Sequence, residues 1–228
     1  MTQGLFITGT DTEVGKTVVT CGLLRVLTKQ RYTAVGMKPV ATGAQATATG
    51  LRNSDAEELL ANSNPRLAYN VINPFVYAEP TAPNIAAGSA EEEVTLEAIS
   101  TAYAACAEAA EFVLLEGLGG WRVPLSDSLQ TVDLVHSLRL PAILVCGLRL
   151  GCINHALLTA AAIAADGVPL LGWVANSVDP GYGYQRATIA TLKARIAAPL
   201  IGITAWHDPL DRDRIATDLA PGGHNLWP

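Results

Sequence analysis

Short apolar runs alternate with helix-length segments along almost the whole chain. The expected strands are residues 5–8, 34–37, 112–115, 142–145, 170–175 and 200–204. The expected helices are residues 15–30, 96–110, 154–165 and 184–197. Strands that are apolar on both faces are typical of a parallel sheet covered by helices on each side. The pattern therefore predicts a single α/β domain over residues 1–228, doubly wound around a mostly parallel sheet.

Two segments interrupt this alternation. Residues 42–53 are small and polar, with Gly43 and Gly50 able to bend the chain, and residues 73–88 are rich in proline and alanine. In a doubly wound fold, loops at the carboxyl ends of strands build the binding site. We therefore expect these two segments to be site-forming loops, and ordinary surface loops are the simpler alternative.

Composition narrows the class of protein. Half of the 228 residues are apolar and the net charge is −6, without a basic cluster, which argues against nucleic-acid and membrane-surface binding. The stretch 156–175 is rich in alanine and leucine, but Asp166, Gly167 and Pro169 interrupt it, so a buried helix, a turn and a strand are expected rather than a membrane span. The start of the chain lacks the features of a signal peptide, and four cysteines without C-x-x-C spacing indicate reduced thiols, no zinc site and a cytoplasmic location.

A phosphate-binding motif lies between the first expected strand and helix. Residues 9–17 read Gly-Thr-Asp-Thr-Glu-Val-Gly-Lys-Thr, which fits G-x-x-x-x-G-K-[ST] in its confirming context. Glycines let backbone N–H groups curl around phosphate oxygens, and the helix N-terminus favours negative charge. Lys16 is then expected at the β- and γ-phosphates and the Thr17 hydroxyl on magnesium, so the chain should bind ATP with Mg²⁺.

Two carboxylates are candidates for the same metal ion. Magnesium prefers hard oxygen ligands and is usually bound by one or two carboxylates together with phosphates and water. Glu116 ends an apolar strand, where its carboxylate would project toward the nucleotide, and Asp55 stands at the expected start of a helix. Asp55 alone would more often be an acid that the helix dipole favours. The phosphate loop strengthens the metal hypothesis for both.

These motifs, with others in the same order, resemble those of the dethiobiotin synthetase family over nearly the whole chain. The resemblance becomes weaker after about Trp206. The matching stretches are residues 9–17, 38–40, 50–55, 78–83, 116–121, 151–156 and 172–176. The resemblance implies ATP- and Mg²⁺-dependent carboxylation and ring closure of 7,8-diaminononanoate with carbon dioxide. The expected intermediates are a carbamate and a carbamic–phosphoric anhydride, and the products are dethiobiotin, ADP and phosphate.

The resemblance also implies roles for particular residues. Lys16 and Lys38 should be catalytic. The implied nucleotide ligands are Glu13, Val14, Gly15, Lys16, Thr17, Val18, Asp55, Glu116, Asn176, Ala205, Trp206 and His207, and the metal ligands are Thr17, Asp55 and Glu116. The implied substrate ligands are Thr12, Lys38, Thr42, Gly151, Cys152, Ile153 and Asn154. In the family, the segment 151–154 comes from the neighbouring subunit, which implies a homodimer with shared sites.

Some of these residues have simpler interpretations. Lys38, which precedes a proline, has the alternative interpretation of a solvated surface lysine. Asn176 has the alternative of capping a turn, and Asn154 that of capping the following helix. Residues 208–213 are highly charged and do not align with the family. The sequence Pro221-Gly222-Gly223 predicts a loop closing over the ribose, or a loose tail.

Three competing functions share some of these features. A nucleotide-switched ATPase of the partitioning or iron–sulfur-carrier type usually has a lysine directly after the first glycine of the loop, where this chain has Thr10. A cobyrinate-type amide synthetase needs a glutaminase domain that the chain has no room for. A non-catalytic nucleotide-binding module would not need two lysines and paired acids.

Overall fold

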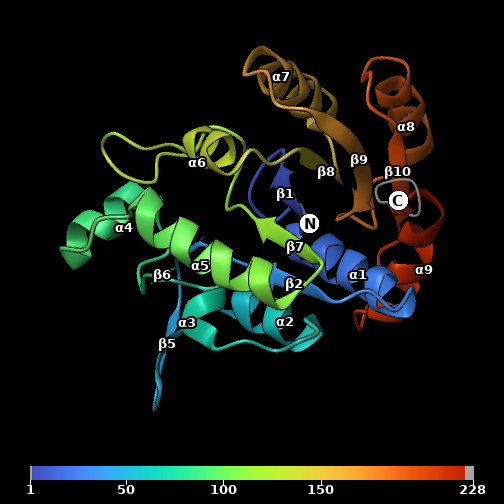
Figure 1. Cartoon of the computed structure of the whole chain (residues 1–228). Coiled ribbons are helices and arrows are strands. Elements are labelled where there is room, and N and C mark those ends of the chain that lie inside the picture. Colours follow the sequence, from blue (N-terminus) through green and yellow to red (C-terminus); the bar gives the residue numbers. More distant parts are fainter. Residues whose placement is uncertain (1, 224–228) are drawn as a thin grey trace.

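A six-stranded sheet forms the centre of the molecule (Figure 1). The computed structural model describes residues 2–223, so Met1 and residues 224–228 of the predicted domain lie outside the described residues. The order is β10-β9-β8-β1-β7-β2, and every neighbouring pair is parallel. The strands are β1 (Gln3–Gly9), β2 (Ala34–Met37), β7 (Phe112–Glu116), β8 (Ala142–Leu148), β9 (Leu170–Ser177) and β10 (Leu200–Thr204). The predicted doubly wound parallel sheet is thereby confirmed.

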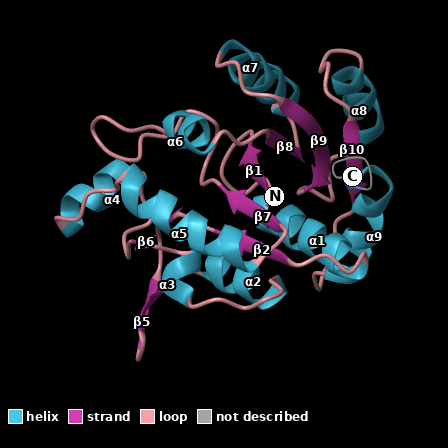
Figure 2. Cartoon of the chain, viewed as in Figure 1, coloured by secondary structure: helices cyan, strands magenta, loops and turns pink. Residues whose placement is uncertain are grey.

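Helices cover both faces of this sheet (Figure 2). On one face lie α1 (Lys16–Lys29), α2 (Ser54–Asn62) and α9 (Arg212–Gly223). On the other lie α3 (Tyr69–Ile72), α4 (Pro83–Ala90), α5 (Leu96–Ala109), α6 (Thr131–Leu138), α7 (Cys152–Ala165) and α8 (Gln185–Lys193). Alternate residues of β1 face opposite sides of the sheet. Leu5 and Ile7 belong to the apolar cluster that contains α1 residues, and Phe6 belongs to the cluster that contains α5 residues. This is why the central strands contain runs of consecutive apolar residues, such as Leu5 to Ile7.

The two segments that interrupt the pattern are more ordered than expected. Residues 42–53 contain an antiparallel hairpin of β4 (Gln45–Thr47) and β5 (Gly50–Arg52), which reaches away from the body in Figure 1. Residues 73–88 contain β6 (Phe75–Val76), which pairs with β3 (Val40–Ala41), and most of α4. The expectation of loops is wrong for these parts, although both segments contribute residues to the candidate site, such as Thr42 and Pro80. Proline is compatible with the first position of a helix, which is where Pro83 stands.

The C-terminal prediction also needs correction. Pro221, Gly222 and Gly223 form the last turn of α9 and are neither a loop over the ribose nor a tail. The helix continues because Ile215, Ala216 and Leu219 bury one side of it against α1 and β10. Gly222 permits close contact with the sheet, since a Cβ there would stand 1.9 Å from the Ile201 carbonyl oxygen.

The stretch 156–175 matches its prediction, because α7 ends at Ala165 and β9 begins at Leu170. No helix within residues 2–223 has both the length and the apolar character needed to cross a membrane. The four cysteines are buried free thiols. The adjacent strands β1, β7 and β2 end side by side, and residues at or just after their ends contribute to the candidate site.

Candidate active site

The phosphate loop connects β1 to α1. Gly15, the residue before the first turn of α1, has φ 85°, a left-handed conformation that favours glycine. A side chain there would also collide, because a Cβ would stand 2.0 Å from Asn176 Nδ2. The loop therefore presents the N-terminus of a 14-residue helix without a capping side chain. Free backbone N–H groups and a positive dipole end are what a phosphate anion requires.

Lys16 crosses the mouth of this loop. Its Nζ donates to the Asp11 carbonyl oxygen at 2.9 Å and to the Gly119 carbonyl oxygen at 2.7 Å. Burial, and then the positive charge of Lys38, lower the pKa of Lys16 to about 8, against the opposing effect of nearby carboxylates. An anion beside it would favour the charged form. Gly119, which helps to position this lysine, was not among the predicted site residues, although it belongs to the glycine-rich stretch after Glu116.

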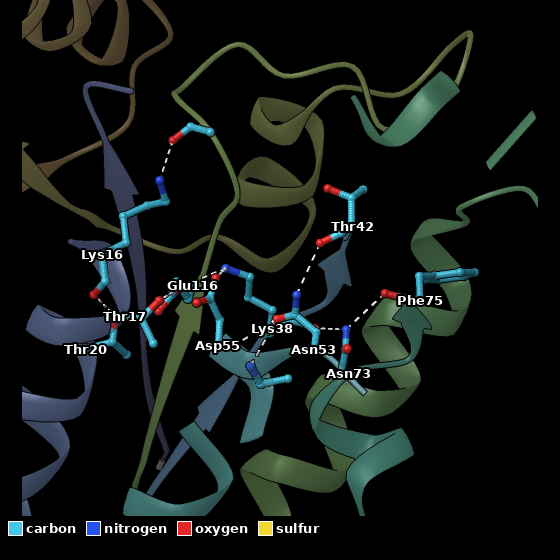
Figure 3. Close-up of polar contacts among 12 residues, drawn as sticks. Lys16, Thr17, Thr20, Lys38, Thr42, Asn53, Asp55, Asn73, Phe75 and Glu116 are labelled. Atoms are coloured by element: carbon cyan, nitrogen blue, oxygen red, sulfur yellow. Dashed lines mark hydrogen bonds and ion pairs between the residues drawn. The ribbon is translucent and has the colours of Figure 1, made fainter. Parts of the chain in front are cut away.

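Lys38 lies between two carboxylates. Its Nζ stands 2.7 Å from Asp55 Oδ2 and 2.6 Å from Glu116 Oε1 (Figure 3). The sheet brings Lys38 and Glu116 together, because Met37 pairs with Leu115 in the parallel register of β2 and β7. Lys38 is only 3% exposed, so its reading as a solvated surface lysine is wrong.

Lys38 and Asp55 hold each other in their charged states. Burial alone would lower the pKa of Lys38, but Glu116 and Asp55 outweigh it and raise the pKa above its ordinary value. Burial would raise the pKa of Asp55, whereas the Lys38 ammonium, with help from the Thr17 hydroxyl and Lys16, holds it below its ordinary value. The cluster is therefore an ion-pair network at the floor of the site.

The residues expected to hold magnesium meet at this network. Thr17 Oγ1 donates to Glu116 Oε1 at 2.9 Å, and Asp55 reaches the same region through Lys38. The second oxygen of Glu116 is buried and has no hydrogen-bond partner among the described residues. Hard oxygens and one uncompensated carboxylate oxygen fit a magnesium ion that shares its coordination with phosphates. No group of three His, Cys, Asp or Glu side chains suited to a metal occurs in residues 2–223. The protein side chains therefore do not supply a complete set of metal ligands at this site.

A cavity of about 810 Å³ opens over the phosphate loop. Its wall includes residues of the loop itself together with residues from both interrupting segments. The lining residues are Asp11, Thr12, Glu13, Gly15, Lys16, Thr17, Val18, Lys38, Thr42, Asn53, Asp55, Pro80, Thr81, Ala82, Pro83, Leu118, Gly119, Gly120 and Val123. The cavity thus brings together the expected phosphate-loop ligands, except the buried Val14, with Thr12, Lys38 and Thr42, which are expected at the substrate.

Asn53 organises one side of this cavity and was missed by the sequence analysis. As the N-cap of α2, its Oδ1 accepts from the backbone N–H of Asp55 and of Ala56. Its Nδ2 donates to the Thr42 carbonyl oxygen at 3.2 Å. One buried side chain therefore fixes both Asp55 and Thr42. An asparagine directly before a helix is a recognisable signal for such a cap.

Asn176 has a structural role at the other end of the loop. It is the last residue but one of β9 and is buried; its Nδ2 donates to the Val14 carbonyl oxygen at 2.9 Å and its Oδ1 accepts from the Thr204 hydroxyl. Ala205, Trp206 and His207 follow β10 and lie outside the cavity lining. Trp206 is half exposed. The structure therefore places 205–207 beyond Asn176, away from Lys16 and Lys38.

The segment 151–154 begins α7 and is also absent from the lining. Gly151 is the N-cap, so Asn154 lies inside the first turn and its reading as the helix cap is wrong. Asn154 is exposed, whereas the Cys152 side chain is buried. Just before this segment, Arg149 forms an ion pair of 2.6 Å with Asp11 of the phosphate loop. Neither partner of this pair was predicted, because they are 138 residues apart.

Comparisons with known proteins identify the family of the chain. The profile of a family described as an AAA domain matches residues 3–214. The chain is 48% identical over 228 residues to the ATP-dependent dethiobiotin synthetase BioD of Yersinia pestis bv. Antiqua, covering 99% of this chain and 94% of that protein. It is 49% identical over 201 residues to the protein of the same name from Xanthomonas oryzae pv. oryzae, covering 88% and 90%.

Solved structures show the same fold at low identity. The MinC:MinD cell division protein complex of Aquifex aeolicus gives a TM-score of 0.62 at 13% identity, covering 98% of this chain and 95% of the other. A ParA family ATPase from Chlorobium tepidum gives 0.55 at 10% identity, covering 96% and 91%. These likenesses establish a P-loop NTPase fold and nothing about function. The close, full-length relatives decide the family: this chain belongs to the ATP-dependent dethiobiotin synthetases.

Proposed function

We propose that this chain catalyses the carboxylation and ring closure of 7,8-diaminononanoate with carbon dioxide, using ATP and magnesium and releasing dethiobiotin, ADP and phosphate. The names of its close relatives support this reaction. One structural observation carries the residue assignments. Lys16, Lys38, Thr17 and Asp55 line a single cavity at the phosphate loop, and Glu116 is bonded directly to two of them.

The proposed reaction has three steps. One amine of the diamine takes up carbon dioxide and loses a proton, which gives a carbamate. A carbamate oxygen attacks the γ-phosphorus, the bond to the β,γ-bridging oxygen breaks, and ADP leaves. The second amine then attacks the carbonyl carbon of the mixed anhydride, loses a proton and expels phosphate, which closes the five-membered cyclic urea. None of these steps needs a covalent bond to the protein, so positioning and charge stabilisation dominate catalysis.

The two lysines supply positive charge where negative charge accumulates. Lys16, at the mouth of the loop, stabilises the β- and γ-phosphates. Lys38, on the neighbouring wall, stabilises the carbamate and the γ-phosphate during transfer. Thr12 and Thr42 line the same cavity and orient the diamine. Their hydroxyls are suited to an amine because each has lone pairs that accept a hydrogen bond.

Thr17, Asp55 and Glu116 would hold the magnesium ion. A magnesium ion bound there neutralises charge on the β- and γ-phosphates. The backbone N–H groups of residues 13–18 bind the phosphates, and Asn176 with residues 205–207 holds the nucleoside. Asn176 keeps amide capacity for this role, since an NH₂ group has two hydrogens and one hydrogen bond from Nδ2, to Val14, is seen.

The substrate carboxylate lies at the far end of an apolar chain, beyond the reach of the phosphate loop. We assign its binding to residues 151–154 of a second subunit in a homodimer. These residues are absent from the cavity lining of their own chain, and the N-terminus of α7 suits an anion. Leu150 and Leu158, which flank the segment, are 89% and 62% exposed, as expected for an interface. Four buried free thiols fit a cytoplasmic location.

Phosphate release is the direct test. We expect release from ATP only when both the diamine and bicarbonate are present, together with formation of dethiobiotin. The control substrate is 7-aminononanoate, which has one amine and cannot close the ring. A rate of ATP hydrolysis that does not depend on the diamine would contradict the proposal and indicate a nucleotide-switched ATPase.

A further inference from the structure

The ammonium group of Lys38 occupies the centre of the proposed magnesium ligands. Its Nζ is 2.7 Å from Asp55 Oδ2 and 2.6 Å from Glu116 Oε1, and the same Glu116 oxygen accepts from Thr17 Oγ1 at 2.9 Å (Figure 3). All three side chains assigned to the metal therefore meet at, or within one hydrogen bond of, a single ammonium group.

A magnesium ion held by the same two carboxylates would lie close to this ammonium group. Magnesium binds oxygen at about 2.0–2.1 Å in near-octahedral geometry. An ion that close to Asp55 Oδ2 and Glu116 Oε1 would stand beside Lys38 Nζ, and the two positive charges would repel strongly where little water screens them. Lys38 is 3% exposed and Glu116 is fully buried. The two cations therefore compete for this carboxylate pair, most strongly at Glu116, because the Asp55 side chain is 42% exposed.

The ammonium is nonetheless needed when no metal is bound. A fully buried carboxylate such as Glu116 is costly unless a cation pairs with it. Lys38 meets this need at Oε1, whereas Glu116 Oε2 is buried with no partner in the described part of the chain. That orphaned oxygen is an independent sign that the site is built for a further positive ligand.

We propose that Lys38 is a place-holder for the metal: in the nucleotide-free protein its ammonium occupies the magnesium position, and arrival of magnesium with the nucleotide displaces it into the cavity. The cavity wall already includes Lys38, so displacement needs only a change of its side-chain rotamer. Binding of the metal then also moves the positive charge of Lys38 toward the substrate. This inference rests on the magnesium site of the proposed function.

If Lys38 is a place-holder, it should lower the metal affinity of the nucleotide-free protein. In wild-type protein, Mn²⁺ as a probe must compete with Lys38, so binding should be weak. Lys38→Met keeps an unbranched side chain that is one atom shorter, and it removes the charged competitor. We expect it to bind Mn²⁺ about tenfold or more tightly than wild type, as measured by the free Mn²⁺ signal in electron paramagnetic resonance. With ADP present, the difference between the two proteins should shrink, because Lys38 has already been displaced.

Lys16→Met is the matched control. It removes a second lysine from the same cavity, but Lys16 Nζ donates to two carbonyl oxygens, those of Asp11 and Gly119, in place of the carboxylates. Its nucleotide-free Mn²⁺ affinity should stay within about threefold of wild type, by the scale expected for a charge without direct contact. If Lys38→Met unfolds without metal, Lys38→Gln takes its place. The glutamine amide still donates to a carboxylate but carries no charge, and the expectation is the same.

The outcomes separate this inference from the function on which it rests. Equal nucleotide-free Mn²⁺ affinities in wild type and the Lys38 variant overturn the place-holder. An equal gain in Lys16→Met also overturns it, because the effect would then be one of general charge. If wild-type protein with ADP binds no more Mn²⁺ than ADP alone, the magnesium site itself fails. If ADP creates the metal site and Lys38→Met changes nothing without ADP, only the place-holder fails.

Discussion

The side-chain amide of Asn176 lies directly against Gly15, so that a Cβ on Gly15 would stand only 2.0 Å from Asn176 Nδ2. The same nitrogen donates to the carbonyl oxygen of Val14. One side chain at the end of β9 thus holds the phosphate loop from behind. The loop depends on this support as well as on its own glycines.

Gly15→Ala should therefore weaken nucleotide binding. The new Cβ has to displace Asn176 or move the loop, and strain of this kind costs about 1–3 kcal/mol. We expect the Kd for ADP in calorimetry to rise about tenfold or more.

Gly167→Ala separates collision from backbone strain. Gly167 also has a positive φ, 69°, but a Cβ there would meet no atom within 4 Å. Its substitution should cost about 1–2 kcal/mol of stability through the left-handed backbone alone and leave ADP affinity unchanged. Wild-type ADP affinity in Gly15→Ala would show that Asn176 and the loop move apart easily.

Lys16→Ala should abolish useful turnover. The variant loses the charge that faces the β- and γ-phosphates, and loss of one such donor in a water-poor site costs about 100- to 1000-fold in kcat. Diamine-dependent phosphate release measures this loss. Lys29→Ala, at the far end of the same helix, is a control that should retain activity. A Lys16→Ala rate within about threefold of wild type is incompatible with the assigned role of the phosphate loop.

Asp55→Asn and Glu116→Gln should each raise the magnesium concentration required for half-maximal rate. Loss of residues that merely support metal ligands already costs about 10- to 100-fold in metal affinity, so we expect a rise of at least that order. Glu57→Gln, two residues along α2 from Asp55, is the control and should titrate like wild type.

Glu116→Gln has a second expected effect. It removes one partner of a buried ion pair, which costs about 3–5 kcal/mol of stability, so its melting temperature must be recorded beside its magnesium titration. A normal magnesium titration in a folded variant excludes that residue from the metal site.

Mixing two inactive variants tests the shared site. Asn154→Asp places a negative charge on the exposed first turn of α7, where it should repel the substrate carboxylate. A dimer of one Lys16→Ala subunit and one Asn154→Asp subunit has one doubly damaged site and one intact site. After random exchange, activity should return to about a quarter of wild type, as expected for a twofold-symmetric dimer with shared sites. A mixture that stays inactive places each site within one chain.

The strands and the phosphate loop were predictable because their signals are local. Strand β1, helix α1 and β2 follow from apolar runs and the glycine pattern, and the observed bounds differ from the predicted ones by at most two residues. Helix α9 was missed because its charges and Pro221 obscure the apolar side formed by Ile215, Ala216 and Leu219. The hairpin β4–β5 was missed because its strands are three residues long, with β4 fully exposed and β5 only partly buried, so they carry no clear apolar alternation.

The site was predictable as a set of residues but not as an arrangement. Lys38 and Glu116 become neighbours only through the register of β2 and β7, which no local pattern reveals. The pair between Arg149 and Asp11, and the cap by which Asn53 fixes Asp55, likewise depend on tertiary contacts. Sequence motifs therefore identified the chemical groups, and the fold determines which of them touch.

The position of β1 in the sheet has a consequence for biosynthesis. This strand is translated well before its partners, β7 and β8, which begin at Phe112 and Ala142. At usual rates of translation, the strand that carries the phosphate loop waits on the order of ten seconds for its neighbours. During that time its apolar surface needs protection from aggregation, and nucleotide cannot provide it, because the ATP site exists only after both partners have arrived.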